Sequence, residues 1–416
     1  MLIPTKKQLD FLSWEFGIFF HFGLRTFYPG YRDWDMREMK TERFNPIQLD
    51  CEEWIKAACD AGAKYAIFTT KHHDGFSNWP SKYTDYSVKN TPWKNGEGDV
   101  VKEYVAACRK YGLKVGLYYS PADYRLKKET ITAEIFETYF INQISELLTD
   151  YGKIDYLWFD GCGAENIEFS KKRIVNAIRT LQPNILIFNM WDPDVRWVGN
   201  ESGIAAFDNS NIVQSVDFSV LADSKENLKE KYFLPAECDV RMRYSHWFTA
   251  DDTELDTVKS VEELMGIYDY SVGRGANLLL NIGPESSGRL PKRDKEMLLK
   301  FGEALKQRFS CPLATVDNPI EKDGKYTFCF DDFKFVNMLV IEEDVSDGEA
   351  VREFEIYAAH PHIMPVYPDG QSVFIGKTIG NKRICKFPTL NANKITVKVT
   401  KRDGTVKIKR IKAFYE

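Results

Sequence analysis

The chain has 416 residues, of which 44% are hydrophobic and 28% charged, an ordinary composition for one large globular domain with a smaller companion. Its net charge of -5, with both signs mixed along the chain, argues against nucleic acid or a membrane as a partner. The start MLIPTKKQLD lacks the apolar core of a signal peptide, no window is apolar enough for a membrane span, and the eight cysteines form no CxxC pair. We therefore expect reduced thiols and a cytoplasmic protein, or a mature form whose leader has been removed.

From residue 16 to about 308, short apolar runs alternate with longer amphipathic runs, which is typical of strand–helix repeats around a parallel sheet. Helical patterns fill most of the gaps, for example at 49–62, 131–152 and 260–273. An eighth strand is expected in IVQSVDF (212–218), and the count predicts a (β/α)8 barrel, the TIM-barrel fold, with an irregular second half. The other seven expected strands are FGIFFHFG (16–23), KYAIFTT (64–70), KVGLYYS (114–120), IDYLWFD (154–160), NILIFNM (184–190), YFLPAEC (232–238) and NLLLNIG (277–283).

After about residue 311 the pattern changes to period-two alternation without a long helical stretch. KITVKVT (394–400) and TVKIKRIKAF (405–414) alternate in this way and are joined across KRDG, as in a β-hairpin. We therefore expect two domains, a (β/α)8-like barrel over residues 1–310 and a small antiparallel β-sandwich over residues 311–416.

Polar side chains cluster where the predicted barrel strands end. On (β/α)8 folds the chemistry takes place at the carboxyl ends of the strands, so residues that are scattered in the sequence would converge in space. The set comprises His21, His72, His73, Asp74, Tyr118, Trp158, Asp160 and Glu237.

Asp160 ends the apolar run IDYLWFD, where a carboxylate loses solvation unless it is hydrogen-bonded or used in chemistry. Trp158 lies two residues earlier on the same strand, so both side chains point to one side. An aromatic ring beside a carboxylate suits the apolar face of a sugar next to its reactive carbon. Asp160 is therefore a candidate nucleophile of a retaining glycosidase, which needs a second carboxyl group about 5–5.5 Å away as general acid.

Two glutamates are candidates for that second acid. Glu201 lies in the aromatic and glycine-rich loop VRWVGNESG (195–203), and Glu237 ends the sixth predicted strand. Glu201 could equally be an exposed loop residue, and Glu237 could form a structural ion pair with Arg241 or Arg243. The pattern alone leaves both assignments open.

The adjacent His72 and His73 raise the question of a metal site. Neighbouring side chains usually point apart, and no further Cys/His cluster supplies a tetrahedral set, so we expect no metal and no cofactor. Neutral imidazoles each donate and accept one hydrogen bond, which suits the hydroxyl groups of a sugar.

Five stretches of the sequence together resemble the α-L-fucosidases of glycoside hydrolase family 29. They follow the family's order and cover essentially the whole predicted barrel. The stretches are WEFGIFFHFGLRTF (14–27), TTKHHDGFSNWPSKYTDYSV (69–88), VGLYYSP (115–121), YLWFDG (156–161) and SVGRGANLLLNIGPESSGRLP (271–291).

This resemblance implies a role for each matching residue. The aspartate of the family's WFDG-like motif is the nucleophile, which corresponds to Asp160. The fucose-binding histidines of the family correspond to His21, His72 and His73, and the pocket lining corresponds to Trp158, Tyr118 and Trp34.

Two further stretches, VRWVGNESG and ECDVRMRYSHWF (237–248), resemble the branch of the family that prefers α-1,3- and α-1,4-linked fucose on branched, Lewis-type glycans. In that branch the glutamate of the VGNE-like motif is the general acid/base, which corresponds to Glu201, 201 − 160 = 41 residues after the nucleophile. Glu237, Arg243 and Trp247 of the second stretch would then bind substrate.

The resulting expectation is a retaining enzyme that removes terminal α-1,3/1,4-linked L-fucose from an oligosaccharide or glycoconjugate substrate by double displacement. Two alternatives stay open. One is a broad-specificity α-L-fucosidase of the family's other branch with Glu237 as acid/base, and the other is a fucose-binding protein without catalysis.

Overall fold

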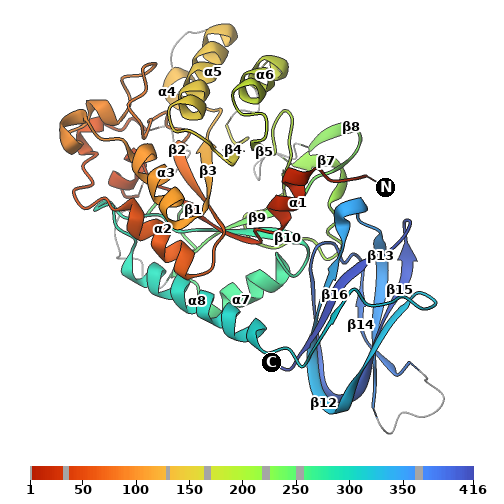
Figure 1. The fold of residues 1–416 in the computed structure, drawn as a ribbon. Helices are drawn as coiled ribbons and strands as arrows, with labels where there is room; N and C mark the ends of the chain where they lie inside the picture. The colour runs from red at the N-terminus through yellow and green to blue at the C-terminus, as the bar shows by residue number, and fades with distance from the viewer. Residues whose placement is uncertain are drawn as a thin grey trace.

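A computed structural model describes residues 2–30, 37–127, 132–163, 170–217, 225–249, 257–360 and 369–416. The chain forms two parts, a parallel barrel that carries the helices and a C-terminal antiparallel sheet (Figure 1). Trp34, one of the predicted pocket residues, lies outside the described ranges. Within these ranges no helix has the length and apolar character needed to cross a membrane.

Eight strands form the parallel sheet of the barrel, in the order β5-β4-β3-β2-β1-β10-β9-β6, which confirms the predicted (β/α)8-like fold. These strands are β1 (Phe16–Phe20), β2 (Tyr65–Lys71), β3 (Lys114–Tyr119), β4 (Tyr156–Phe159), β5 (Leu186–Phe188), β6 (Arg196–Trp197), β9 (Ala236–Arg241) and β10 (Ala276–Asn281). The helices are α1 (Lys6–Leu12), α2 (Cys51–Asp60), α3 (Val100–Tyr111), α4 (Tyr124–Lys127), α5 (Ala133–Thr149), α6 (Lys171–Leu181), α7 (Val261–Tyr270) and α8 (Lys292–Ser310).

The local sequence explains these elements. Every residue of β1, β2, β4, β5 and β10 is buried, because helices cover the outer face of a parallel sheet and side chains fill the barrel. Helices α2 and α3 begin at capping residues: the side chains of Asp50 and Asp99 each accept a backbone N–H of the first turn at 2.9 Å. Gly112, with φ of 74°, ends α3 in the left-handed conformation.

The second half of the barrel differs from the prediction in its strands. The predicted eighth strand, 212–218, forms β7 (Ile212–Asp217), but β7 pairs antiparallel with β8 (Lys225–Phe233) outside the barrel sheet. The eighth barrel strand is instead β6, which has two residues and therefore no periodicity to detect. The predicted strand 232–238 is also wrong in extent, since it divides at Pro235 between β8 and β9.

The seam between β5 and β6 nearly closes the barrel. Phe188 forms an isolated parallel bridge with Val195, and the backbone N–H of Asn189 donates to the Val195 carbonyl at 2.8 Å. The side-chain carbonyl of Asn189 accepts the backbone N–H of Trp197 at 3.1 Å. These contacts hold the two-residue strand β6 in place.

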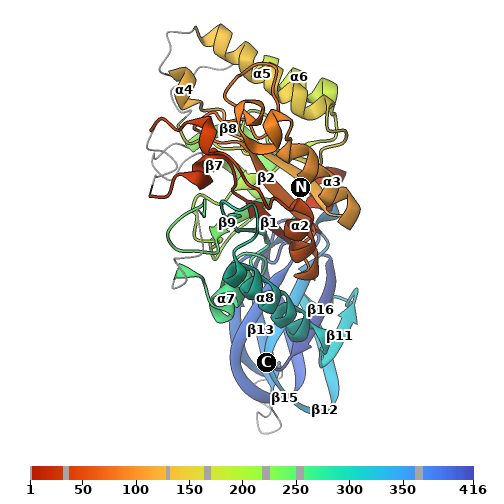
Figure 2. The same ribbon diagram turned by 90° about the vertical axis from the view of Figure 1, so that its left-hand side faces the viewer.

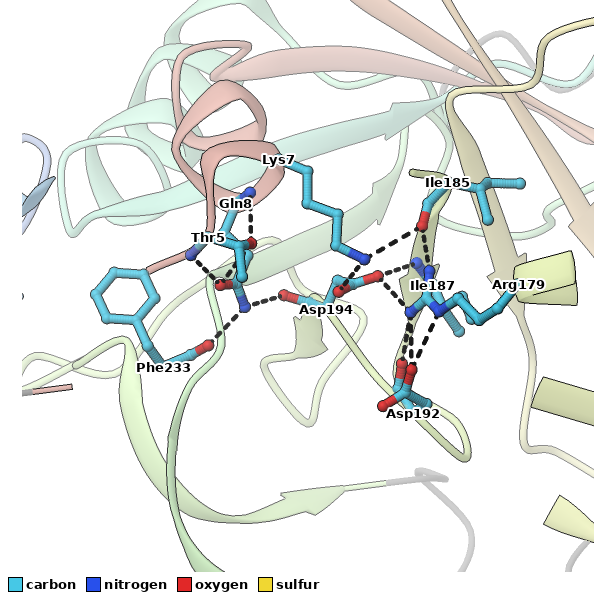
Figure 3. A network of polar contacts seen from close by, with 9 residues as sticks. All are labelled: Thr5, Lys7, Gln8, Arg179, Ile185, Ile187, Asp192, Asp194 and Phe233. Carbon is cyan, nitrogen blue, oxygen red and sulfur yellow. Dashed lines mark hydrogen bonds and ion pairs between the residues drawn. The ribbon is translucent and has the colours of Figure 1, made fainter. Parts of the chain in front are cut away.

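A polar network around the buried Asp194 supports this seam (Figure 3). Its carboxylate accepts the backbone N–H of Ile187 at 3.0 Å, pairs with Arg179 of α6 at 2.9 Å and pairs with Lys7 of α1 at 2.6 Å. Gln8 of α1 donates to the Asp194 carbonyl at 3.0 Å. The network therefore ties α1 and α6 to the turn between β5 and β6.

Helix α1 and the turn that follows it also fill the amino end of the barrel with aromatic rings. Phe11 lies with its ring centroid 6.0 Å from that of Tyr65 and 5.5 Å from that of Tyr156, and Trp14 lies 5.4 Å from Tyr65. Tyr65 and Tyr156 are the first residues of β2 and β4. The interior is thus packed at this end, and the opposite end is left for chemistry.

The C-terminal part is a six-stranded antiparallel sheet in the order β11-β16-β12-β15-β13-β14, with its own apolar core. The predicted hairpin across KRDG is wrong, because β12 lies between β15 and β16 and pairs with both. Register shifts interrupt the pairing of the long strands β12 and β15. The strands are β11 (Ala314–Asp317), β12 (Lys325–Glu343), β13 (Val351–Ala359), β14 (Gln371–Gly376), β15 (Arg383–Arg402) and β16 (Ile408–Phe414).

The C-terminal sheet lies against one end of the barrel part, beside α7 and α8 (Figure 2). Phe309 at the end of α8 packs against Phe414 of β16, with ring centroids 5.8 Å apart. Thr378 donates to the carbonyl of Asn209 in the barrel part at 2.5 Å. The division into folding domains at residues 310 and 311 stays a prediction.

Candidate active site

Predicted site residues lie at the carboxyl ends of four strands that are neighbours in the sheet, β1 to β4. His21 directly follows β1, His72 and His73 directly follow β2, and Asp160 directly follows β4. Tyr118 is the next-to-last residue of β3. The parallel pairing therefore brings these side chains to one end of the barrel.

Asp160 is held by hydrogen bonds to both of its oxygen atoms. Oδ1 accepts the backbone N–H of Cys162 at 2.9 Å, and Oδ2 accepts the Tyr118 hydroxyl at 2.8 Å. His73 Nε2 lies 3.5 Å from Oδ2, while its Nδ1 lies 2.6 Å from the Ser120 hydroxyl. The Asp160 side chain nevertheless keeps 24% of its surface exposed, so the carboxylate is oriented and accessible at once.

His21 and His72 are buried imidazoles beside this carboxylate. Burial lowers the pKa of His21 to about 3, and burial followed by the charge of His73 lowers the pKa of His72 well below its usual range, so both rings are neutral at pH 7. His21 Nδ1 lies 2.7 Å from the side-chain carbonyl oxygen of Asn281, which makes Nδ1 the donor and Nε2 an acceptor. His72 Nδ1 is buried without a hydrogen-bond partner among the described residues.

Aromatic rings form a wall around the histidines and Asp160. Trp158 is stacked between Tyr118 and Phe188, with ring centroids 5.4 Å and 4.1 Å away. Trp247 lies 4.8 Å from the ring of His21, and Phe248 lies 5.0 Å from the ring of His72. The sequence analysis missed Asn281 and Phe248, because neither ends a predicted strand and the family resemblance assigns neither a role.

Glu237 lies deeper in the barrel than the other predicted residues and is 1% exposed. Its Oε1 accepts the indole N–H of Trp158 at 2.8 Å and the hydroxyl of Tyr156 at 3.2 Å, and its Oε2 accepts the hydroxyl of Tyr65 at 2.7 Å. Burial raises the pKa of Glu237 to about 7. These three hydrogen bonds place the carboxyl group in a cage of aromatic donors.

Arg243 serves a different carboxylate. Its guanidinium forms a buried, forked pair with Asp294 of α8, with Nε 3.0 Å and 3.1 Å from the two oxygens and Nη2 2.8 Å from Oδ1. The interpretation of Glu237 and Arg243 as an ion pair is therefore wrong. Arg241 lies with its guanidinium 5.5 Å from the ring centroid of Trp247.

The loop that carries Glu201 runs beside β9. The loop leaves β6, where the backbone N–H of Val198 donates to the Glu237 carbonyl at 3.2 Å, and it returns to β9 through an antiparallel bridge between Ser202 and Val240. A buried acid on β9, Asp239, accepts the indole N–H of Trp197 at 2.6 Å. Glu201 therefore lies at the carboxyl end of the barrel, next to β9.

His72, His73 and Asp160 offer ligand atoms that all lie within 4.8 Å of one another, which is the spacing of a metal site. The same groups suit a sugar, because a carboxylate and two imidazoles supply acceptors and donors for hydroxyl groups. In this cluster Oδ2 of Asp160 already accepts the hydroxyl of Tyr118. The expected absence of a metal stays a prediction.

A cavity of about 560 Å³ adjoins the site, in the size range of small-molecule sites. Its lining includes Tyr124, whose ring centroid lies 5.7 Å from that of His73. The cavity therefore lies beside His73, the histidine next to the candidate nucleophile Asp160. The lining bears both signs of charge, with Arg25, Arg125, Asp74 and residues 37–42 among its members.

A barrel that presents an oriented carboxylate, neutral imidazoles and stacked aromatic rings at the carboxyl ends of its strands defines a carbohydrate-active enzyme. Residues 5–308 match the family model described as alpha-L-fucosidase, and the chain belongs to this family, glycoside hydrolase family 29. It is accordingly an α-L-fucosidase, a glycoside hydrolase.

Known relatives agree with this family. Alpha-L-fucosidase 1 of Arabidopsis thaliana is 31% identical over 92% of this chain and 82% of its own length. The crystal structure of a glycoside hydrolase 29 family member from an unknown rumen bacterium has a TM-score of 0.87 and 34% identity, covering 99% of this chain and 77% of that one. A Ruminococcus gnavus GH29 fucosidase in complex with fucose has a TM-score of 0.83 and 26% identity, covering 100% of this chain and 95% of that one.

Proposed function

We propose that the protein is a retaining α-L-fucosidase that hydrolyses terminal α-1,3/1,4-linked L-fucose from oligosaccharides or glycoconjugates, with Asp160 as nucleophile and Glu201 as acid/base. The observation that carries the proposal is the placement of Asp160, an oriented and partly exposed carboxylate flanked by His73 and Tyr118. A carboxylate fixed in this way can attack an anomeric carbon without first reorganising its hydrogen bonds.

In the first step an oxygen of Asp160 forms a bond to the anomeric carbon of fucose while the bond from that carbon to the leaving oxygen breaks. Glu201 gives its proton to the leaving oxygen. In the second step a water attacks the anomeric carbon, Glu201 takes a proton from that water, and the bond to Asp160 breaks. Two inversions give the same configuration in substrate and product.

The neutral histidines and the aromatic wall support fucose as the sugar. His21 presents Nε2 as an acceptor, and the buried Nδ1 of His72, which has no partner among the described residues, suits a hydroxyl group of the substrate. Stacked rings such as Trp158 suit the methyl group that fucose carries in place of a hydroxymethyl group.

The surroundings of the two glutamates favour Glu201 over Glu237 as acid/base. Glu237 accepts hydrogen bonds from three side chains of the barrel interior, those of Tyr65, Tyr156 and Trp158. Glu201 lies in a loop at the carboxyl end of the barrel, bridged to β9 at the next residue. The VGNE-like motif and the adjoining cavity support a branched acceptor and hence the α-1,3/1,4 linkage.

The test compares Glu201→Ala with Glu237→Ala. A general acid matters most for a basic leaving group, so Glu201→Ala should cleave a Lewis-type trisaccharide very poorly and yet still form the fucosyl-enzyme from an activated aryl fucoside. Azide needs no base and should then release the sugar as an azide of retained configuration. Glu237→Ala should lose binding or stability without azide rescue.

Rescue of Glu237→Ala and not of Glu201→Ala would reverse the assignment, and the linkage preference would fall with it. Another outcome is that the wild-type enzyme has equal kcat/KM values for the aryl fucoside and the Lewis-type trisaccharide once the difference in leaving-group basicity is taken into account. That result would favour the broad-specificity branch. A wild-type protein that binds fucose without turning over the aryl fucoside would be a fucose-binding protein instead.

A further inference from the structure

A segment of the barrel part, residues 205–211, is held by the C-terminal sheet. Arg383, the first residue of β15, donates from Nη1 to the carbonyl of Phe207 at 3.0 Å, and its Cζ lies 5.0 Å from the Phe207 ring centroid. Thr378, just after β14, donates to the carbonyl of Asn209 at 2.5 Å. The C-terminal sheet therefore holds the main chain of this segment at two carbonyl groups.

A buried carboxylate adds a third contact between the sheet and this segment. Glu349, just before β13, accepts the Ser210 hydroxyl at 2.8 Å through Oε1 and the backbone N–H of Asn211 at 2.9 Å through Oε2. Its charge is paired within the sheet by Arg352, at 3.0 Å. Because the carboxylate is shielded from water, these hydrogen bonds cannot be exchanged for bonds to solvent without cost.

Asn209 links this segment to both ends of the loop that carries Glu201. Its Oδ1 accepts Nη2 of Arg196, the first residue of β6, at 2.6 Å. Its Nδ2 donates to the carbonyl of Arg274 at 2.9 Å, and Nη1 of Arg274 donates to the carbonyl of Ala205 at 2.6 Å. The strand before the loop and the chain after it are thus attached to the residue that the C-terminal sheet holds.

Glu201 lies in a turn between these two attachment points. The side-chain carbonyl of Asn200 accepts the backbone N–H of Ser202 at 3.1 Å and closes the turn. An isolated antiparallel bridge from Ser202 to Val240 joins the turn to β9 and puts Glu201 opposite Arg241, at the carboxyl end of that strand. An isolated bridge fixes less of the backbone than a ladder does, so the turn takes much of its position from the chain at its two ends.

We propose that the C-terminal sheet positions the acid/base, with Arg383, Thr378 and Glu349 as positioning residues that hold residues 205–211 and thereby place the carboxyl group of Glu201. This inference rests on the proposed role of Glu201. A general acid must lie within hydrogen-bond reach of the leaving oxygen, and a displacement of about 1 Å can cost about 100-fold in rate. Because a proton donor matters most for a basic leaving group, the sheet should matter for natural glycosides and little for activated ones.

The test is the dependence of kcat/KM on the leaving group for Thr378→Val and Arg383→Met. Valine is close to threonine in shape but cannot donate a hydrogen bond, and methionine keeps an apolar chain beside Phe207 without the guanidinium. The substrates are aryl fucosides whose phenols rise in basicity, together with a Lewis-type trisaccharide. In both variants kcat/KM should change by less than about twofold for the most activated aryl fucoside and fall at least about tenfold for the trisaccharide.

Lys386→Met is the matched control. Lys386 is a second cation of β15 that reaches the barrel part, but it pairs with Asp269 of α7, at 3.1 Å, and not with residues 205–211. Its kcat/KM should follow that of the wild type for every leaving group. A merely structural role would lower kcat/KM by the same factor for all leaving groups in Thr378→Val and Arg383→Met. That parallel loss, no change in either variant, or an equal steepening in Lys386→Met would overturn the inference.

A double variant separates this inference from the proposed function. Adding Thr378→Val to Glu201→Ala should not steepen the leaving-group dependence further, because the group to be positioned is already absent, and a further steepening would contradict the positioning role. If Glu201→Ala shows azide rescue while Thr378→Val and Arg383→Met run parallel to the wild type, the acid/base assignment stands and the positioning role falls. If Glu201→Ala shows no rescue, both fall together.

Discussion

Replacing Glu237 by glutamine tests the aromatic cage in the barrel interior. The amide has almost the same shape as the carboxyl group, keeps an acceptor for the indole N–H of Trp158, and cannot ionise. The folded protein raises the pKa of Glu237 from 4.5 to about 7, and the cause is burial. The carboxyl group is therefore more easily protonated in the folded than in the unfolded chain.

The sign follows from proton counts. Between pH 4.5 and about 7 the folded protein binds this proton and the unfolded chain does not, so the free energy of unfolding falls as the pH rises through this window. At about 1.4 kcal/mol per pH unit, the Glu237 contribution to that fall is about 3 kcal/mol. Glu237→Gln should lack this contribution, so its stability relative to wild type should rise by about 3 kcal/mol from pH 4.5 to pH 8.

Tryptophan fluorescence during urea unfolding suits this measurement, because all nine tryptophans precede residue 248 and report on the barrel. Glu343 of the C-terminal sheet also has a pKa raised to about 7, but it is present in both proteins and cancels from the difference. A wild-type minus variant difference that is constant with pH, or that grows with pH, would refute the account of the cage.

Two other predictions concern the pocket and the barrel. L-Galactosides should have a lower kcat/KM than L-fucosides, because their extra hydroxyl group would be buried against aromatic rings without a partner, and equal values would contradict the proposed pocket. Arg243→Met should lower the free energy of unfolding in urea by about 3–5 kcal/mol, because it removes the buried cation that is paired with the carboxylate of Asp294. Adding Asp294→Leu should recover much of that loss, and a double variant no more stable than Arg243→Met would count against the pair.

Strands with long apolar runs were predictable because burial on both faces leaves a strong signal in the sequence. β1, β2, β3, β4 and β10 fall within two residues of the predicted starts, and Asp160 follows its strand directly. The polar residues at the ends of β1 to β4 could then be grouped, since parallel strands bring their carboxyl ends together. The parallel topology therefore predicted that these residues lie close together, although they are far apart in the sequence.

The second half of the barrel was harder to predict for a physical reason. β6 has two residues, and its place depends on tertiary contacts such as the bridge from Phe188 to Val195. The antiparallel ribbon of β7 and β8 has the same local pattern as a barrel strand, because alternation does not record the pairing partner. The pattern therefore predicted the right number of barrel strands but assigned the eighth to β7 instead of β6.

The same limit applies to the site. Asp239 lies two residues after Glu237 in sequence, but its hydrogen bond with the indole N–H of Trp197 joins β9 to β6 and has no motif in the sequence. Asn281 orients His21 from the far end of the barrel domain's sequence, and such second partners have no motif of their own. Sequence patterns find residues that end strands and miss those that act through another side chain.

The central claim, that Asp160 attacks the anomeric carbon, is tested most directly by trapping the fucosyl-enzyme. A fucosyl fluoride that carries fluorine in place of the ring hydroxyl next to the anomeric carbon reacts with the nucleophile and is released slowly, because fluorine destabilises the cationic transition state of both steps. Peptide mapping by mass spectrometry should find the added fluorofucosyl mass on the peptide that contains Asp160, and Asp160→Asn should remain unlabelled. A label on any other carboxyl group, or inactivation without a covalent adduct, would contradict the account.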